Sequence, residues 1–78
     1  MRVELRLYAT LRRFAPNAEG GALFVEMPEG ASAADLIAKV KVDAGEVHIL
    51  MVNGRSSPFV QRLAEGDRIG LFPAIGGG

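Results

Sequence analysis

The sequence predicts an α+β domain in which a single sheet packs on one main helix. Several short segments alternate between apolar and polar residues, which is typical of strands with one buried face. One segment, beginning at Ser32, instead repeats its apolar residues at helical spacing. The segments follow the order strand, strand, helix, strand, minor element, strand. This order suits one mixed sheet of four to five strands folded over one helix.

The first two strands are expected to form a hairpin. Residues 2–8 alternate between apolar and other side chains, which predicts a strand. One side of this strand carries Val3, Leu5 and Leu7, and the other carries Arg2, Glu4, Arg6 and Tyr8. Residues 9–14 carry Leu11 and Phe14 at helical spacing, which predicts a short helical turn and then a loop. Residues 23–27 alternate again and predict a second strand, antiparallel to the first, with Phe24 on its outer side.

The helix is expected to begin after Ser32. Ser32 and Asp35 have the spacing of a capping box, in which each side chain accepts a hydrogen bond from the other residue's backbone. Apolar residues follow at helical spacing, and the face expected to pack on the sheet consists of Leu36, Ile37 and Val40. The segment Asp43-Ala44-Gly45 is expected to end the helix.

Two further strands are expected over residues 48–52 and 68–72. His48 is interpreted as a partly buried packing residue rather than a catalyst, and Asn53-Gly54 predicts a tight turn after the first of these strands. Residues 55–58 receive no assignment, and the open end of the core is expected to be covered by Phe59, Val60 and Leu63. The last strand places Ile69 and Leu71 on one side and Phe72 on the other. Its apolar run favours a central position beside the first strand.

Length and composition exclude several classes of protein. A chain of 78 residues makes one domain. The absence of cysteine excludes cysteine zinc sites and cysteine nucleophiles, and the single His48 cannot build a metal cluster, so no metal site is expected. A net charge of zero argues against non-specific nucleic-acid binding. No signal peptide or long apolar run is present, so we expect a cytoplasmic protein without a membrane partner.

Four arginines lie close together near the start of the chain: Arg2, Arg6, Arg12 and Arg13. A solvated face is the ordinary interpretation of such a group. A small anion site or a contact with an acidic partner is the alternative.

Residues 73–78 are expected to form a flexible tail after a folded domain of residues 1–72. Pro73 removes a backbone donor and marks the end of the last strand. Gly76, Gly77 and Gly78 have no side chains to pack, and a glycine backbone can enter a channel too narrow for other residues. The tail therefore suits delivery of a sterically open terminal carboxylate. An inert, frayed end is the alternative.

Several segments keep the order and spacing of a known family. They are residues 3–12, Met27-Pro28-Glu29-Gly30-Ala31-Ser32 with Asp35-Leu36, Val52-Asn53-Gly54, residues 63–73 and the final Gly77-Gly78. Together they resemble the β-grasp, ubiquitin-like sulfur carriers of the MoaD/ThiS family. Among these the chain is most similar to the small subunit of molybdopterin synthase. Its Gly76 departs from the Ser, Ala or Thr that this subunit more often has. An ending of three glycines also occurs among thiazole-synthesis carriers.

The resemblance implies a sulfur carrier that is not an enzyme on its own. A ubiquitin-activating-like enzyme would adenylate the Gly78 carboxylate with ATP, and the adenylate would become a thiocarboxylate. The large molybdopterin synthase subunit would accept the tail, and sulfur would pass to the precursor of the molybdenum or tungsten pterin cofactor. The chain itself would bind no cofactor.

Partner docking is expected at Tyr8, Phe72, Ile75 and, as a contact with acidic groups, Arg12. The alternative for Phe72 is a small structural cluster with Phe59. Three alternatives for function stay open: a thiazole or other sulfur carrier, a ubiquitin-like modifier joined to lysines through Gly78, and a binding module with an inert tail. A free-standing enzyme fits least, because no nucleophile with a base, paired carboxylates or phosphate loop is visible.

Overall fold

The computed structural model describes residues 1–74 of the chain. Its strands are β1 (Arg2–Leu7), β2 (Ala22–Glu26), β3 (Ile49–Val52), β4 (Arg55–Ser56) and β5 (Arg68–Phe72), and its helix is α1 (Ala33–Lys39). Three short 3-10 helices lie between them: η1 (Ala9–Phe14), η2 (Glu19–Gly21) and η3 (Ala44–Glu46). The predicted α+β class is confirmed, and the arrangement is a β-grasp fold.

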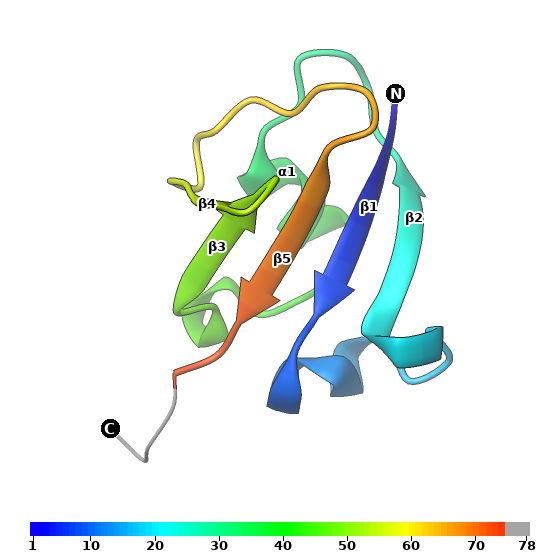
Figure 1. Ribbon diagram of the computed structural model, residues 1–78, viewed down its shortest axis with the longest axis vertical. Helices are drawn as coiled ribbons and strands as arrows, with labels where there is room; N and C mark the ends of the chain where they lie inside the picture. The colour runs from blue at the N-terminus through cyan, green and yellow to red at the C-terminus, as the bar shows by residue number, and fades with distance from the viewer. Residues whose placement is uncertain (75–78) are drawn as a thin grey trace.

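The five strands form one mixed sheet in the order β2-β1-β5-β3-β4. β1 and β5 are parallel. The other three pairs, β1–β2, β3–β4 and β3–β5, are antiparallel. The last strand is thus central and lies beside the first, as predicted. Figure 1 shows that β1 and β5 run in the same direction and that both lead toward the end of the sheet where η1 lies.

The core fills the space between α1 and one face of the sheet. Its most deeply buried side chains include Leu5 and Leu7 of β1, Ile69 and Leu71 of β5, and Leu36 of α1. The register places Leu5 beside Ile69 and Leu7 beside Leu71, so the two central strands direct neighbouring apolar side chains at the helix. Burying each such side chain contributes roughly 1.5–3 kcal/mol. The predicted inner faces of the first and last strands are confirmed.

The beginning of α1 is the predicted capping box. The Ser32 hydroxyl oxygen accepts a hydrogen bond from the Asp35 backbone N–H at 3.2 Å, and an Asp35 carboxylate oxygen accepts one from the Ser32 backbone N–H at 2.9 Å. These bonds satisfy two backbone donors that a helix start would otherwise leave without partners. Two hydrogen bonds with Ser32 lower the pKa of Asp35 below its usual value. The bond to the Ser32 backbone has the larger effect, and the bond to its side chain has the smaller one.

The lowered pKa of Asp35 predicts a pH-dependent contribution to stability. Because the folded-state pKa lies below the unfolded-state value, this contribution is present above the unfolded pKa and is lost as pH falls through the folded pKa. Asp35→Asn should therefore be less stable than the wild type near neutral pH, with the difference shrinking in acid. Urea denaturation of both proteins across this pH range measures the effect. A stability difference that does not change with pH would contradict the prediction.

The prediction for the end of α1 was wrong. The helix ends at Lys39, and Lys41 adopts a left-handed backbone conformation with φ of 62°. The Lys41 N–H donates to the Ala38 carbonyl and the Val42 N–H donates to the Ile37 carbonyl, which is the hydrogen-bond pattern of a Schellman motif. This turn directs Val42 into the core. Asp43, expected in the helix end, instead caps η3 by accepting from the Gly45 N–H.

Two other predictions need correction, and one segment without an assignment forms a strand. His48 is exposed and precedes β3, so it is not a partly buried packing residue. Residues Arg55 and Ser56, which received no assignment, pair with β3 as the short edge strand β4. Leu63 covers the core as expected, but Val60 is 76% exposed, and Phe59, at 39% exposed, is not part of the buried core. The isolated bridge from Ser32 to Arg62 draws this loop toward α1 and leaves Phe59 and Val60 at its outer bend.

Candidate functional site on the open face of the sheet

The face of the sheet opposite α1 carries no other element of residues 1–74, and Figure 1 shows it toward the viewer. Its side chains are the outward residues of the alternating strands: Glu4 and Arg6 of β1, Arg68, Gly70 and Phe72 of β5, Ile49 and Met51 of β3, and Phe24 of β2. The register places Arg6 and Met51 on either side of Gly70. We call this surface the open face.

Two aromatic rings stack on the open face at the C-terminal end of β5. The Tyr8 and Phe72 ring centroids are 4.3 Å apart and the planes differ by 4°. The Tyr8 N–H donates to the Leu71 carbonyl at 3.1 Å, which extends the β1–β5 pairing by one residue and brings Tyr8 beside Phe72. Such pairs contribute roughly 0.5–1.5 kcal/mol beyond their buried area.

Gly70 makes room for this aromatic pair. A Cβ atom at position 70 would lie 3.4 Å from a ring carbon of Tyr8 and 3.4 Å from a ring carbon of Phe72. It would lie 3.9 Å from the Met51 Cβ. Any longer side chain on β5 at this point would therefore meet both rings. A depression of about 160 Å³ lies here, and its lining residues include Gly70, the two rings, Met51, Arg6 and Arg68.

A substitution at Gly70 tests this packing. Gly70→Ala should keep the stack and change the free energy of unfolding by less than about 1 kcal/mol, because the added methyl group only reaches ordinary contact. Gly70→Leu should displace both rings and fill the depression. The ring-proton NMR shifts of Tyr8 and Phe72 measure the difference. Identical ring shifts in Gly70→Leu and the wild type would contradict the assigned role of Gly70.

The arginines of the open face have different surroundings. Arg6 Nε donates to a Glu4 carboxylate oxygen at 2.7 Å, and this hydrogen bond and charge raise the pKa of Arg6 above its usual value. The Arg68 guanidinium forms no ion pair within residues 1–74. Arg2 lies over the Phe24 ring, with the guanidinium carbon 4.5 Å from the ring centroid.

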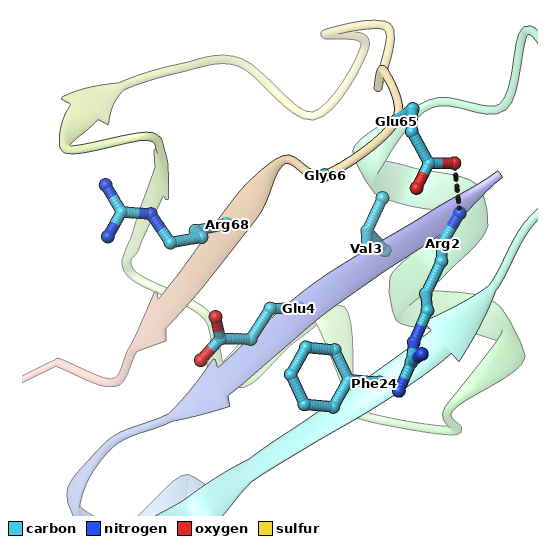
Figure 2. A pocket seen from close by; sticks show the side chains of 7 residues that line it. All are labelled: Arg2, Val3, Glu4, Phe24, Glu65, Gly66 and Arg68. Carbon is cyan, nitrogen blue, oxygen red and sulfur yellow. Dashed lines mark hydrogen bonds between the residues drawn. The ribbon is translucent and has the colours of Figure 1, made fainter.

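A second depression, of about 340 Å³, lies at the opposite end of the open face. Figure 2 shows Arg2 and Phe24 side by side, and the Arg2 backbone N–H donating to a Glu65 carboxylate oxygen at 2.9 Å. Phe24 is on the outer face, as expected, and is 62% exposed. Phe24 is the register partner of Glu4 in the middle of β1, whereas the Tyr8–Phe72 stack lies beyond the end of β1, so the open face has two separate apolar patches.

The start of the predicted tail lies between η1 and η3. The His48 N–H donates to the Phe72 carbonyl at 2.7 Å, β5 ends there, and Pro73 is buried. Pro73 and Ala74 line a depression of about 270 Å³ together with Thr10, Glu46 and His48. An ion pair between Arg13 and Glu46 joins η1 to η3. The predicted site residues Ile75, Gly76, Gly77 and Gly78 lie outside the described residues.

The structure brings only part of the predicted site together. Tyr8 and Phe72 meet, and the ring that stacks on Phe72 is that of Tyr8, whereas Phe59 lines a separate depression beside β3. Arg12 lies on η1 with its side chain near Gly21 and does not line the depression at Gly70. The expected group of four arginines is dispersed: Arg2 lies over Phe24, Arg6 pairs with Glu4, and Arg13 pairs with Glu46.

Sequence reasoning missed Gly70, Arg68 and Met51 as members of the site. The alternation of residues 68–72 already placed Arg68 and Gly70 on the outer side with Phe72, and this signal could have found them. Met51 joins only through the β3–β5 register.

Within residues 1–74, no group of three or more His, Cys, Asp or Glu side chains is arranged to hold a metal ion. None of the helices described is long and apolar enough to cross a membrane.

A mixed five-stranded sheet over one helix, with the last strand central, defines a ubiquitin-like protein of the β-grasp class. Residues 1–76 match the model of the family described as Mut7-C ubiquitin. The chain therefore belongs to this family. No curated protein matches it.

Solved structures share the fold across nearly the whole chain. A protein from Pyrococcus furiosus, provisionally named molybdopterin converting factor, subunit 1, is 28% identical, with 95% of this chain and 98% of that chain covered and a TM-score of 0.76. SAMP1 from Haloferax volcanii is 21% identical, with full coverage of both chains and a TM-score of 0.77. A complex of subunits 1 and 2 of the molybdopterin-converting factor from Helicobacter pylori contains a chain that is 23% identical, with full coverage of both chains and a TM-score of 0.65. The predicted resemblance to ubiquitin-like carriers of the MoaD type is confirmed.

Proposed function

We propose that this protein is a sulfur carrier for the synthesis of a molybdenum or tungsten pterin cofactor. The observation that carries the proposal is the position of β5: the central strand ends at Phe72 beside Tyr8, and the sequence then leads to Gly76-Gly77-Gly78. The 28% identity to the Pyrococcus furiosus protein over 95% of the chain supports the molybdopterin pathway.

The reacting group is the carboxylate of Gly78. A carboxylate is a poor electrophile, so one of its oxygens first attacks the α-phosphorus of ATP on a partner enzyme, and pyrophosphate leaves. A hydrosulfide sulfur then attacks the carbonyl carbon, the bond to AMP breaks, and a thiocarboxylate remains. The partner enzymes supply the catalytic groups. This chain supplies a glycine backbone narrow enough to enter their active sites.

Two partner proteins follow from this chemistry. One is the adenylating enzyme. The other is a large subunit that would hold the pterin precursor, and the structure of the Helicobacter pylori complex of subunits 1 and 2 supports a partner of this kind. Both must reach the tail, and the Tyr8–Phe72 stack lies directly beside the point where β5 ends. Tyr8 and Phe72 are both partly buried, and a surface aromatic pair of this kind suits the apolar centre of a docking surface.

The intact mass of the protein tests the proposal. After incubation with ATP, the activating enzyme of the same organism and sulfide, we expect a gain of about 16 Da, the replacement of one oxygen by sulfur, on the peptide that ends at Gly78. The mass of the protein isolated from its natural host checks that Gly78 carries the free carboxylate. No gain from an enzyme that is active on another carrier would refute the proposal. Isopeptide bonds from Gly78 to lysines would indicate a protein modifier instead.

A further inference from the structure

We propose that the depression at Gly70 binds a carboxylate side chain, from Asp or Glu, of the enzyme that activates the tail. This inference rests on the proposed function, because that function supplies the partner. It adds the chemistry by which this surface selects the partner. The Tyr8–Phe72 stack would provide apolar contact area, and the neighbouring arginines would bind one acidic group and set the orientation of the complex.

Two arginines from different strands line the depression at Gly70. Arg6 is its register partner on β1, and Arg68 precedes it by two residues on the same face of β5. Figure 2 shows the Arg68 side chain extending from β5 away from β1. A guanidinium group offers several N–H donors in a planar fork that matches a carboxylate.

The local acidic groups leave the guanidinium donors of Arg68 available within residues 1–74, whereas Arg6 already has Glu4 and Tyr8 as neighbours. Glu4 accepts from Arg6 through Nε, so the terminal nitrogens of Arg6 are not used in that bond. Asp67 neighbours Arg68 in sequence, but its oxygens accept from the Asn53 amide at 2.9 Å and from the Ala64 N–H at 2.7 Å. No carboxylate lines the depression itself. Because Glu4 offsets the charge of Arg6, the excess positive charge of the site comes from Arg68, although the whole chain has a net charge of zero.

The size of the depression favours a single side chain. Its volume of about 160 Å³ is well below the roughly 300–1,000 Å³ typical of small-molecule pockets. The rings of Tyr8 and Phe72 with Met51 provide an apolar wall for the aliphatic part of a glutamate, while the arginines meet its carboxylate. Charge complementarity of this kind contributes mainly to the choice of partner and to the association rate.

The first test uses a small probe and does not depend on the proposed function. N-acetyl-glutamate N-methylamide is titrated into the full-length protein, and the backbone amide NMR signals are followed. We expect saturable shifts at Arg6, Arg68 and Gly70, and their loss in Arg68→Gln. Absence of these shifts, or equal shifts in Arg68→Gln, overturns the inference. Tighter saturation by inorganic phosphate than by the glutamate probe would make this a phosphate site and overturns it as well.

The second test measures the partner directly. The activating enzyme of the same organism is assayed by carrier-dependent exchange of pyrophosphate into ATP, which gives kcat and KM for the carrier. Arg68→Glu should raise KM at least about tenfold with little change in kcat, because like charges repel at the contact, and Arg68→Lys should recover part of the loss. Higher salt should raise the KM of the wild type more than that of Arg68→Glu. Lys41→Glu makes the same charge change at an exposed residue next to α1 and should behave as the wild type.

The outcomes separate the two proposals. No exchange with the wild-type carrier refutes the proposed function, while the glutamate titration still decides the carboxylate site. Exchange with the wild type and an unchanged KM in Arg68→Glu refutes the carboxylate site and leaves the proposed function standing. An equal rise of KM in Arg68→Glu and Lys41→Glu would reflect net charge alone and also refutes the site.

Discussion

Deletion of Gly77 and Gly78 is expected to abolish thiocarboxylate formation and to leave the free energy of unfolding within about 0.5 kcal/mol of the wild type. The loss of thiocarboxylate and the unchanged stability have separate reasons. The deletion removes the reacting carboxylate and shortens the reach of the tail, so the activating enzyme loses its substrate. The lost residues have no side chains that could stabilise the domain. Intact mass after the activation reaction and urea denaturation measure the two effects.

Gly76→Ser is the matched control for this deletion. It changes the same segment but leaves Gly77 and the Gly78 carboxylate in place, so thiocarboxylate should still form. Two results would count against the proposed role of the tail: a stability loss of several kcal/mol on deletion, or a mass gain that persists without Gly78.

Gly21→Ala is expected to destabilise the protein by about 2–5 kcal/mol. Gly21 is buried with φ of 76°, a left-handed conformation that disfavours side chains. An added Cβ would also lie 2.5 Å from the Leu7 carbonyl oxygen, a separation at which backbone must move. Leu7 is the last residue of β1 and precedes Tyr8, so the strain falls beside the aromatic stack. Urea denaturation measures the loss.

The adjacent glycine separates the two causes of this loss. Gly20 has φ of 63°, but a Cβ there meets nothing within 4 Å. Gly20→Ala should therefore cost only the left-handed backbone term, about 1–2 kcal/mol. Equal losses in the two variants would show that the contact with the Leu7 carbonyl has no effect.

Local patterns were sufficient for much of the fold. The alternation of residues 2–8 and 68–72 predicted β1, β5 and their buried faces, because side chains on a strand point alternately to opposite sides. The Ser32 and Asp35 spacing predicted the start of α1, because a capping box involves residues three apart. The end of α1 was missed because Lys41, and not a glycine, adopts the left-handed conformation there. That choice is stabilised by burial of Val42, which is a tertiary effect.

By itself, the sequence determined the class of fold, the outward positions of Tyr8 and Phe72 and the glycine-rich end, since each depends on residues close together in the chain. Only the tertiary structure decided that Tyr8 stacks on Phe72 across Gly70, and that Arg6 and Arg68 share one depression while Arg12 and Arg13 lie elsewhere. The physical reason is register. Residues 6 and 70 become neighbours only through the parallel pairing of β1 with β5, which the core between the sheet and α1 selects.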